Sequence, residues 1–582
     1  MLATGIRAHR WLILTLALAS GFWAFDLAGL RAGVPDPLDD TWEYGVVARS
    51  LIEGRGFRTQ VIHPPLWSLR DGSNTVPVLI HGPLVPLALA PRVRLFGPRA
   101  LEWVPILAAE LALLAAFFAY RIGARHFGPP AGAAAALLWT LSPLTLRAVH
   151  HDIALTAGAA LLMLALDLLL QPRRSAALAG LALGLGYLAR PELLLAAPVL
   201  LGLAGRTGWR TALAFAACAT PWWLHNAAAT GSPLFNLSSY LAIGYWDGRP
   251  ELTVLRDFAL SPAAWPHALG EALPSLPAKW LEFFPHAVKR ALLVPTAASG
   301  WLALVGLAAA LRAPETRRAA VAALLIALVP VAVMTTTVYD DRYLTPFLPL
   351  WAIAVALGAR TLAAALPAAF PEWARPPVWL SALAVLALPS VIPAVREAER
   401  EARVLERRLA FEKASLAPLT LGAATQRALL FSDLPDFAAW TADRPVVWVT
   451  REEFGWLPAQ GEPNPRGLPE RGSATATWFH VTRGAESPPK SAHAPHSRPT
   501  TAKGASPPLA PLPGLDSVAP PGASIHMRPN ARPAWVSTVP SRAPALITAL
   551  AASAFSPRTS TLGIGLDVFD LGAPFGISAW LR

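Results

Sequence analysis

The stretch DIALTAGAALLMLALDLLLQPRR, residues 152–174, determines the class of fold to which this chain belongs. Residues 153–170 form an apolar run that is long enough to cross a bilayer as a helix, which takes about 17–25 residues. An aspartate precedes the run, and two arginines follow it. The stretch therefore predicts a membrane-spanning helix with one acidic end and one basic end.

Similar apolar runs recur over the first two thirds of the chain, and we count about eleven. Their approximate bounds are 11–29, 101–120, 131–148, 153–170, 176–189, 192–205, 211–225, 291–311, 319–337, 344–362 and 378–395. Two of them, 176–189 and 192–205, are shorter than a span, and they fit two truncated helices that meet at Arg190-Pro191-Glu192. The sequence predicts an all-α polytopic membrane protein, with its transmembrane domain over residues 1–395.

The composition supports this fold class and excludes others. Hydrophobic residues make up 54% of the 582 residues and charged residues 15%, against about 25% charged in an ordinary soluble domain. The single cysteine, Cys218, excludes internal disulfides and cysteine-built metal sites. The chain contains neither GxxxxGK[ST] nor a strand followed by GxGxxG, so no nucleotide-hydrolysing or dinucleotide module is supported.

The positions of the arginines explain the net charge of +12 through membrane topology rather than nucleic-acid binding. With a cytoplasmic N-terminus, every inner connection carries at least two arginines, and the long segments 31–100 and 226–290 lie outside. We therefore expect an integral, multi-pass protein of the plasma (inner) membrane. Within the outer segments, residues 41–53 predict a helix, and residues 83–96 predict a helix that lies in the membrane interface.

Beyond residue 396 the long apolar runs end. Residues 396–413 predict a charged helix, residues 427–450 a strand, a helix and a strand, and residues 475–482 a further strand. We expect residues 396–483 to form a small extracytoplasmic α/β appendage. Residues 484–582 are rich in Pro, Ser and Ala without a sustained period, which is typical of a disordered tail.

Unusual polar side chains gather at the predicted outer ends of the spans and in the outer loops, and this common side predicts a polar cavity. The candidates are Asp39, Asp40, Tyr44, His63, His151, Asp152, Arg190, Glu192, His225, Asn226, Asp341, Arg342 and Tyr343. His150 and Asp340 lie beside them in the sequence.

The acidic candidates have structural alternatives. Asp40 and Glu43 have the spacing of a capping box for the helix 41–53, whereas a partly exposed carboxylate at a helix start also suits a general base. Asp39 and Asp40 are adjacent and cannot both face one cavity, so either can be the base. Asp152 has the position of an N-cap for the helix that follows it. A divalent metal ion on Asp40, His151 and Asp152 stays open as a cofactor.

The basic candidates suit a phosphate. A guanidinium in a membrane-embedded break offers charge and paired donors, which Arg190 would supply and Arg342 would supplement. The alternatives are a buried ion pair between Arg190 and Glu192 that orders the break, and neutralisation of Arg342 by the aspartates that precede it.

Together these motifs resemble the GT-C class of membrane glycosyltransferases, in particular the dolichyl-phosphate-mannose protein mannosyltransferases and the bacterial aminoarabinose transferases that modify lipid A. The resemblance rests on LDDTWEYGVVARSLIEGRGF (38–57), HDIALTAGAALLMLAL (151–166), GLGYLARPELLL (184–195), PWWLHNAAATGSPLF (221–235) and DDRYLTPFLPLW (340–351).

The resemblance implies a sugar donor carried on a polyprenyl phosphate and inverting transfer to a hydroxyl of a lipid, glycan or protein. It also implies Asp40 as the catalytic acid of the first outer loop, with Tyr44 four residues later and Asp152 as the second outer acid. Arg190, Arg342 and Tyr343 match positions near the lipid phosphate. Many relatives have Asp-Glu where this chain has Asp40-Thr41.

Two other classes are weighed against the transferase. A transporter or flippase for a lipid-linked substrate should have broken helices in corresponding positions of two halves, and the sequence has one break, at Pro191. A scaffold that only anchors the C-terminal appendage predicts no cluster of outer acids and arginines.

Overall fold

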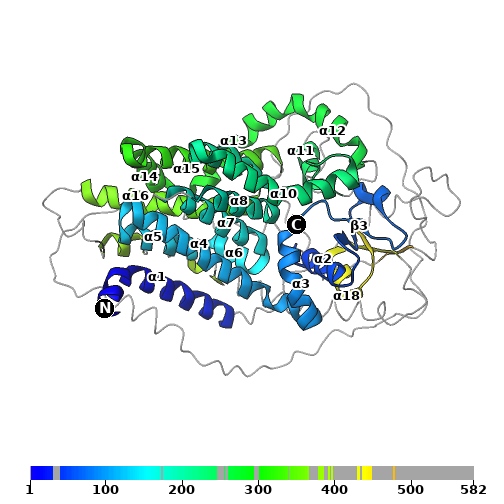
Figure 1. The fold of residues 1–582 in the computed structure, drawn as a ribbon, viewed down its shortest axis with the longest axis horizontal. Helices are drawn as coiled ribbons and strands as arrows, with labels where there is room; N and C mark the ends of the chain where they lie inside the picture. The colour runs from blue at the N-terminus through cyan, green and yellow to red at the C-terminus, as the bar shows by residue number, and fades with distance from the viewer. Residues whose placement is uncertain are drawn as a thin grey trace, which may run out of the picture. The chain divides into compact units, whose positions relative to one another are not determined.

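The computed structural model of the chain describes residues 2–29, 40–171, 175–244, 255, 260–293, 300–337 and 340–365, with parts of 376–396 and 429–478. The chain divides into two compact units, residues 1–488 and 489–582, and every described residue lies in the first. Most described residues are helical (Figure 1), which confirms the predicted helical class for this part of the chain.

Apolar helices that pack in series form the bundle of the first unit. Each contacts the next in the order α10 (Gly208–Thr230), α8 (Ala176–Ala189), α7 (Ile153–Leu170), α4 (Val104–Phe127), α5 (Pro129–Thr140), α16 (Leu348–Ala365), α14 (Gly300–Arg312) and α15 (Pro314–Thr336). Helix α1 (Leu2–Gly29) packs against α4 and α5. Glycines permit the closest approaches: a Cβ at Gly306 or Gly358 would overlap the facing backbone of α16 or α14.

The predicted spans correspond to helices with several differences in length. Five helices among the described residues are long and apolar enough to cross a membrane, and a sixth span results if α5 and α6 (Pro143–His151) count as one. That pair replaces the single span expected over 131–148. It is bent by 52° just before Pro143, which has no N–H to continue the helix. The expected count of about eleven is therefore not established.

The remaining segments are short or fall partly outside the described residues. The break at Pro191 is a 3₁₀ turn, η3 (Pro191–Ala196), which separates α8 from α9 (Ala197–Ala204). The sequence predicted two truncated helices that meet at this break. The segment expected over 291–311 divides between the end of α13 (Leu276–Leu293) and α14. Much of the segment expected over 378–395 lies outside the described residues.

The first outer segment folds over one end of the bundle. Its helices are α2 (Thr41–Ile52) and α3 (Leu84–Phe96), which pack against each other and occupy the predicted positions. Between them lie β1 (Arg58–Thr59), β2 (Val61–Ile62), η1 (Pro64–Leu69) and β3 (Val76–Pro77), with β1 antiparallel to β3. The second outer segment contributes α11 (Leu241–Gly244), α12 (Trp265–Ala272) and α13.

The C-terminal region contributes β4 (Leu429–Ser432), α18 (Pro435–Ala442), β5 (Val446–Trp448) and β6 (Ala476–Trp478), in the predicted order of strand, helix, strand and strand. The three strands join β2 of the outer segment in one parallel sheet of order β2-β5-β4-β6. The shared sheet means that the appendage is not built from residues 396–483 alone. Its predicted boundaries stay predictions, and residues 397–428 and the tail from 484 lie outside the described residues.

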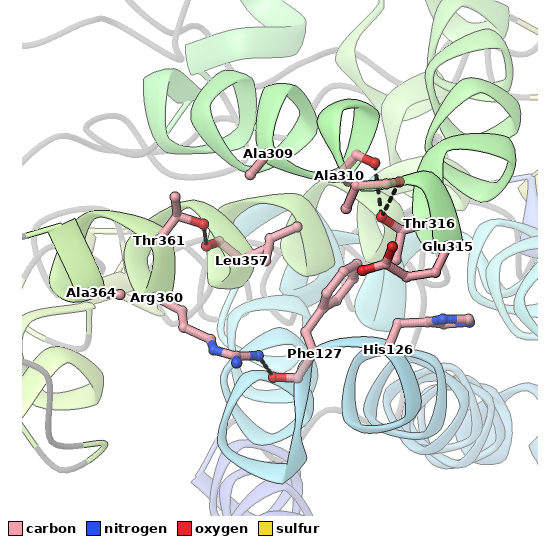
Figure 2. A pocket seen from close by; sticks show the side chains of 11 residues that line it. His126, Phe127, Ala309, Ala310, Glu315, Thr316, Leu357, Arg360, Thr361 and Ala364 are labelled. Carbon is pink, nitrogen blue, oxygen red and sulfur yellow. Dashed lines mark hydrogen bonds between the residues drawn. The ribbon is translucent and has the colours of Figure 1, made fainter.

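The two ends of the bundle carry different sets of charged and polar side chains. Asp167, near the C-terminal end of α7, pairs with Arg121 at 3.2 Å and Arg125 at 3.0 Å, both from a predicted inner connection. Beside them, residues of α4, α14, α15 and α16 line a pocket of about 320 Å³ that includes His126 and Arg360 (Figure 2). Asp152 lies at the opposite end of α7, where the other candidate residues gather.

Candidate active site

Arg190 lies between two carboxylates at the break that follows α8. Its Nη1 donates to Asp152 Oδ2 at 3.0 Å, and its Nε donates to Glu192 Oε1 at 2.7 Å. Each of the three side chains is only 8% exposed. Gly158 lets the arginine lie against α7, since a Cβ there would come within 3.1 Å of the arginine's Cγ. The expected Arg190–Glu192 ion pair is therefore present, and Asp152 adds a second negative partner.

Asp152 also has the N-cap role that the sequence predicted. Its Oδ1 accepts a hydrogen bond from the backbone N–H of Ala154 at 3.0 Å. One carboxylate thus caps α7 and holds Arg190 at the same time. These two bonds explain how a charged side chain is stabilised when it is almost fully buried.

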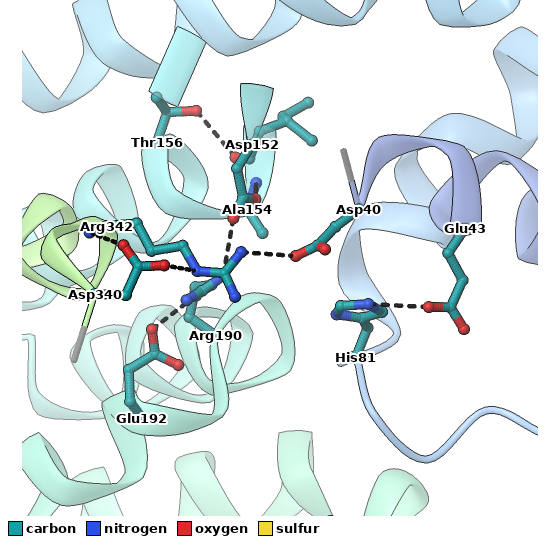
Figure 3. A network of polar contacts seen from close by, with 11 residues as sticks. Asp40, Glu43, His81, Asp152, Ala154, Thr156, Arg190, Glu192, Asp340 and Arg342 are labelled. Carbon is teal, nitrogen blue, oxygen red and sulfur yellow. Dashed lines mark hydrogen bonds and ion pairs between the residues drawn. The ribbon is translucent and has the colours of Figure 1, made fainter. Parts of the chain in front are cut away.

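Arg342 belongs to η9 (Asp341–Phe347), the turn that precedes α16. Asp340 caps this turn through the backbone N–H of Arg342 and lies 2.7 Å from the guanidinium Nε. The guanidinium carbons of Arg190 and Arg342 each lie 5.7 Å from the ring centroid of Tyr343. Both cations therefore share one aromatic side chain. Figure 3 shows the two arginines with their carboxylate partners, and a phosphate site on them stays a prediction.

Asp40 faces this pair from the start of α2. Its Oδ2 lies 3.6 Å from Arg342 Nη1, and its side chain is 23% exposed. No side-chain bond caps α2, so the predicted capping box with Glu43 is wrong. The physical reason is that both carboxylates have stronger partners: Asp40 turns to a guanidinium, and Glu43 turns to His81 (Figure 3). Asp39 lies outside the described residues.

Glu43 and His81 form a second charged pair beside Asp40, which the sequence patterns did not predict. Glu43 Oε2 lies 3.1 Å from His81 Nε2, in a largely buried environment. Burial acts to raise the pKa of Glu43, but His81 and, at a longer distance, His63 outweigh it and lower the pKa to about 2. Burial acts to lower the pKa of His81, but Glu43 and Asp40 raise it to about 9. His81 is therefore an imidazolium at neutral pH.

Tyr44 and His63, both predicted as cavity residues, border this pair. The ring of Tyr44 meets the ring of His81 edge to face, with centroids 4.9 Å apart. His63 Nε2 lies 3.9 Å from Glu43 Oε2. A local signal for His81 existed in the sequence: the imidazole lies in His81-Gly82-Pro83, directly before the interfacial helix. Gly82 is required there because a Cβ would overlap the carbonyl group of Leu188.

Other predicted cavity residues have structural contacts instead. The Nε2–H of His225 donates to the carbonyl oxygen of Val78 at 3.1 Å, and the His225 ring stacks on Trp222. Asn226 donates to the carbonyl oxygen of Phe235 at 3.0 Å. These contacts hold the outer segments in place. They do not support the prediction that His225 and Asn226 line the cavity.

Asp341 and His151 also differ from the central residues. Asp341 pairs with Arg290 of α13 rather than with Arg342, so Asp340 alone of the two aspartates lies against Arg342. His151 is half-buried as the last residue of α6. Its neighbour His150 lies 2.7 Å from Asp26 of α1.

The geometry gives no support to the metal alternative on Asp40, His151 and Asp152. Among the residues that the structure describes, no three His, Cys, Asp or Glu side chains converge as metal ligands would. The carboxylates have cationic partners instead: Asp40 faces Arg342, and Asp152 holds Arg190. Of this central group, Asp40 and Arg342 are the more exposed members, with side chains 23% and 38% exposed, and are the ones an incoming ligand can reach.

Comparison with known proteins identifies similar sequences and structures. Residues 80–231 match the family model described as dolichyl-phosphate-mannose-protein mannosyltransferase. This range includes His81, Asp152, Arg190 and Glu192, and it confirms the resemblance to polyprenyl-phosphate-dependent glycosyltransferases. None of the curated proteins compared matches the chain.

Two solved structures are similar at low identity. The first is ArnT from Cupriavidus metallidurans bound to undecaprenyl phosphate, with 15% identity, a TM-score of 0.48, and coverage of 77% of this chain and 87% of that one. The second is the oligosaccharyltransferase of Archaeoglobus fulgidus in complex with Zn and sulfate, with 13% identity, a TM-score of 0.49, and coverage of 75% of this chain and 62% of that one.

Proposed function

We propose that this chain is an inverting glycosyltransferase of the plasma (inner) membrane. It moves a sugar from a polyprenyl-phosphate donor to a hydroxyl of a lipid, glycan or protein acceptor at the outer face. The observation that carries the proposal is the pairing of Asp40 with Arg342 at 3.6 Å, beside the buried Arg190. A carboxylate and two guanidiniums from separate parts of the sequence meet where the predicted outer ends of the spans lie.

The two arginines suit the leaving phosphate. As the bond between the anomeric carbon and the phosphate oxygen breaks, negative charge grows on the phosphate, and fixed cations stabilise that charge. Arg190 is held by Asp152 and Glu192, so it is a rigid donor at the back of the site. Arg342 is more exposed and makes the first contact with an incoming phosphate.

Asp40 suits the general base. It takes the proton of the acceptor hydroxyl while that oxygen bonds to the anomeric carbon from the face opposite the phosphate, which inverts the configuration. A donor phosphate competes with Asp40 for Arg342, because both are anions. Binding of the donor therefore loosens the contact between Asp40 and Arg342 and makes the carboxylate available to the acceptor.

The test is transfer from a labelled polyprenyl-phosphate sugar by membranes that contain the protein. Asp40→Asn should lower the rate by about 10²–10⁴, the usual contribution of general-base catalysis, and should not weaken donor binding, because it removes the anion that competes with the phosphate for Arg342. Arg342→Gln should weaken donor binding. Glu53→Gln is the matched control, because this exposed acid lies at the other end of α2.

Three results would contradict the proposal. Transfer by Asp40→Asn at the wild-type rate would remove Asp40 as the base. A wild-type protein that moves the lipid-linked sugar across the bilayer without transferring it would identify the transporter that the sequence left as the alternative. A cysteine-accessibility map that places positions 40 and 342 on opposite sides would refute the topology.

A further inference from the structure

Helix α18 of the C-terminal region is fixed against α2, the helix that carries Asp40. The rings of Phe437 and Trp42 meet edge to face with centroids 5.0 Å apart. Arg49 of α2 donates to the carbonyl oxygens of Trp440 at 3.0 Å and Ala439 at 2.9 Å, near the C-terminal end of α18. The first turn of α18, with Asp436, is thereby held beside the candidate active site.

The adjoining strand strengthens this attachment. Strand β5 pairs with β2 through Val446 and Val447, opposite Val61 and Ile62. The ring of Trp448, at the end of β5, meets the ring of His63 with centroids 5.3 Å apart. The C-terminal region thus contacts the segment that carries Glu43 and His63 in two places, through α18 and through β5.

Polar atoms without hydrogen-bond partners gather at this junction. They are Glu43 Oε1, both ring nitrogens of His63, and Asp436 Oδ1, counted among the residues that the structure describes. Glu43 and His63 are only 2% and 3% exposed. Buried polar groups are almost always hydrogen-bonded, so several unpaired ones in one place indicate that a polar ligand completes them. We call Glu43, His63, His81 and Asp436 the junction cluster.

The charges of the junction cluster define the class of ligand. The carboxylate of Glu43 and the imidazolium of His81 cancel each other. Burial raises the pKa of Asp436 well above its usual range, and the negative charges of Glu43 and Asp40 raise it further, which favours the protonated carboxyl group. The buried atoms without partners are carboxyl oxygens and imidazole nitrogens, so the cluster suits a ligand that offers both hydrogen-bond donors and acceptors.

We propose that the junction cluster binds the polyhydroxyl ring of a sugar, and that Asp436 of the C-terminal helix is a specificity-determining residue of this site. The inference rests on the proposed function, because its ligand is one of the two reacting molecules. A neutral ring with several hydroxyls supplies both donors and acceptors at short spacing, as the unpaired atoms require. The ring can belong to the donor or to a glycosylated acceptor, and Asp40 lies beside it in either case.

The experiment compares Asp436→Leu with Asp436→Asn in the full-length protein. Leucine removes the hydrogen bonds, whereas asparagine is uncharged and keeps a donor and an acceptor. Binding of a labelled polyprenyl-phosphate sugar and of the unglycosylated polyprenyl phosphate is measured together with the KM for the acceptor. Asp443→Asn is the matched control, since this exposed residue pairs with Arg49 at the other end of α18.

A donor-ring site predicts that Asp436→Leu weakens binding of the glycosylated lipid about tenfold and leaves binding of the unglycosylated lipid unchanged. An acceptor-ring site predicts that Asp436→Leu raises the acceptor KM about tenfold and leaves both lipid affinities unchanged. In each case Asp436→Asn restores most of the loss.

The inference is overturned if Asp436→Leu folds, as judged by its thermal midpoint, and changes none of the three quantities. His63→Leu, from the outer segment, should give the same pattern and replaces Asp436→Leu if that variant does not fold. Both lipid-binding measurements are made without transfer. A negative result for the sugar-ring site can therefore be told apart from a normal transfer rate in Asp40→Asn, which would refute the proposed base instead.

Discussion

Alkaline pH should destabilise this protein through the loss of one charge, that of His81. Contact with Glu43 raises the pKa of His81 from 6.5 to about 9. The folded state therefore holds its proton more tightly than the unfolded state does. The stabilisation is complete below pH 6.5 and is lost as the pH rises to about 9. A shift of this size corresponds to about 3 kcal/mol, at 1.36 kcal/mol for each pH unit.

The partner residue gives a consistent magnitude. The pKa of Glu43 is lowered from 4.5 to about 2, a shift of similar size in the opposite direction. Both shifts include the contact of 3.1 Å between the two side chains, so the energy of that contact is counted once. Stability from the carboxylate is present above pH 4.5 and is lost as the pH falls toward 2. The pair therefore contributes fully between about pH 4.5 and 6.5.

The assay is thermal unfolding in detergent from pH 5.5 to 9.5. The wild type should lose midpoint temperature between pH 6.5 and 9, and His81→Gln should start lower and lose less over the same range. His267→Gln, on α12, is the matched histidine control. Parallel curves for wild type and His81→Gln would refute the reasoning, because the titrating group would then lie elsewhere.

Two glycines permit further tests. Gly82→Ala should displace His81 and lower both stability and transfer, because the new Cβ would overlap the carbonyl group of Leu188; its thermal midpoint and transfer rate are the measurements. Gly306→Ala should separate α14 from α16 and cost about 1–3 kcal/mol, since its Cβ would overlap the carbonyl oxygen of Ala354. The same change at Gly202, where a Cβ meets nothing within 4 Å, should leave the midpoint unchanged, and equal losses at Gly202 and Gly306 would contradict the packing argument.

Local patterns in the sequence predicted most elements of the bundle and the nature of its polar end. The runs over 153–170 and 176–189 coincide with α7 and α8, because an apolar run without helix breakers forms its hydrogen bonds within itself. Pro191 predicted the break from the local sequence as well, because proline has no N–H to continue a helix. Counting spans also predicted that Asp152, Arg190 and Arg342 share one end of the bundle, which the structure shows; that this end faces outward stays a prediction.

Tertiary structure decided the partners of those residues. Glu43 has the spacing of a capping residue, but it binds His81, which is 38 residues away, because a buried imidazolium is a stronger partner than a backbone N–H. Asp436 lies almost 400 residues from Asp40 and reaches the same site through the pairing of β2 with β5 and the packing of α18 against α2. Hydropathy and capping depend on neighbours along the chain, whereas the identity of an ion pair depends on which distant segments the packed fold brings within a few ångströms.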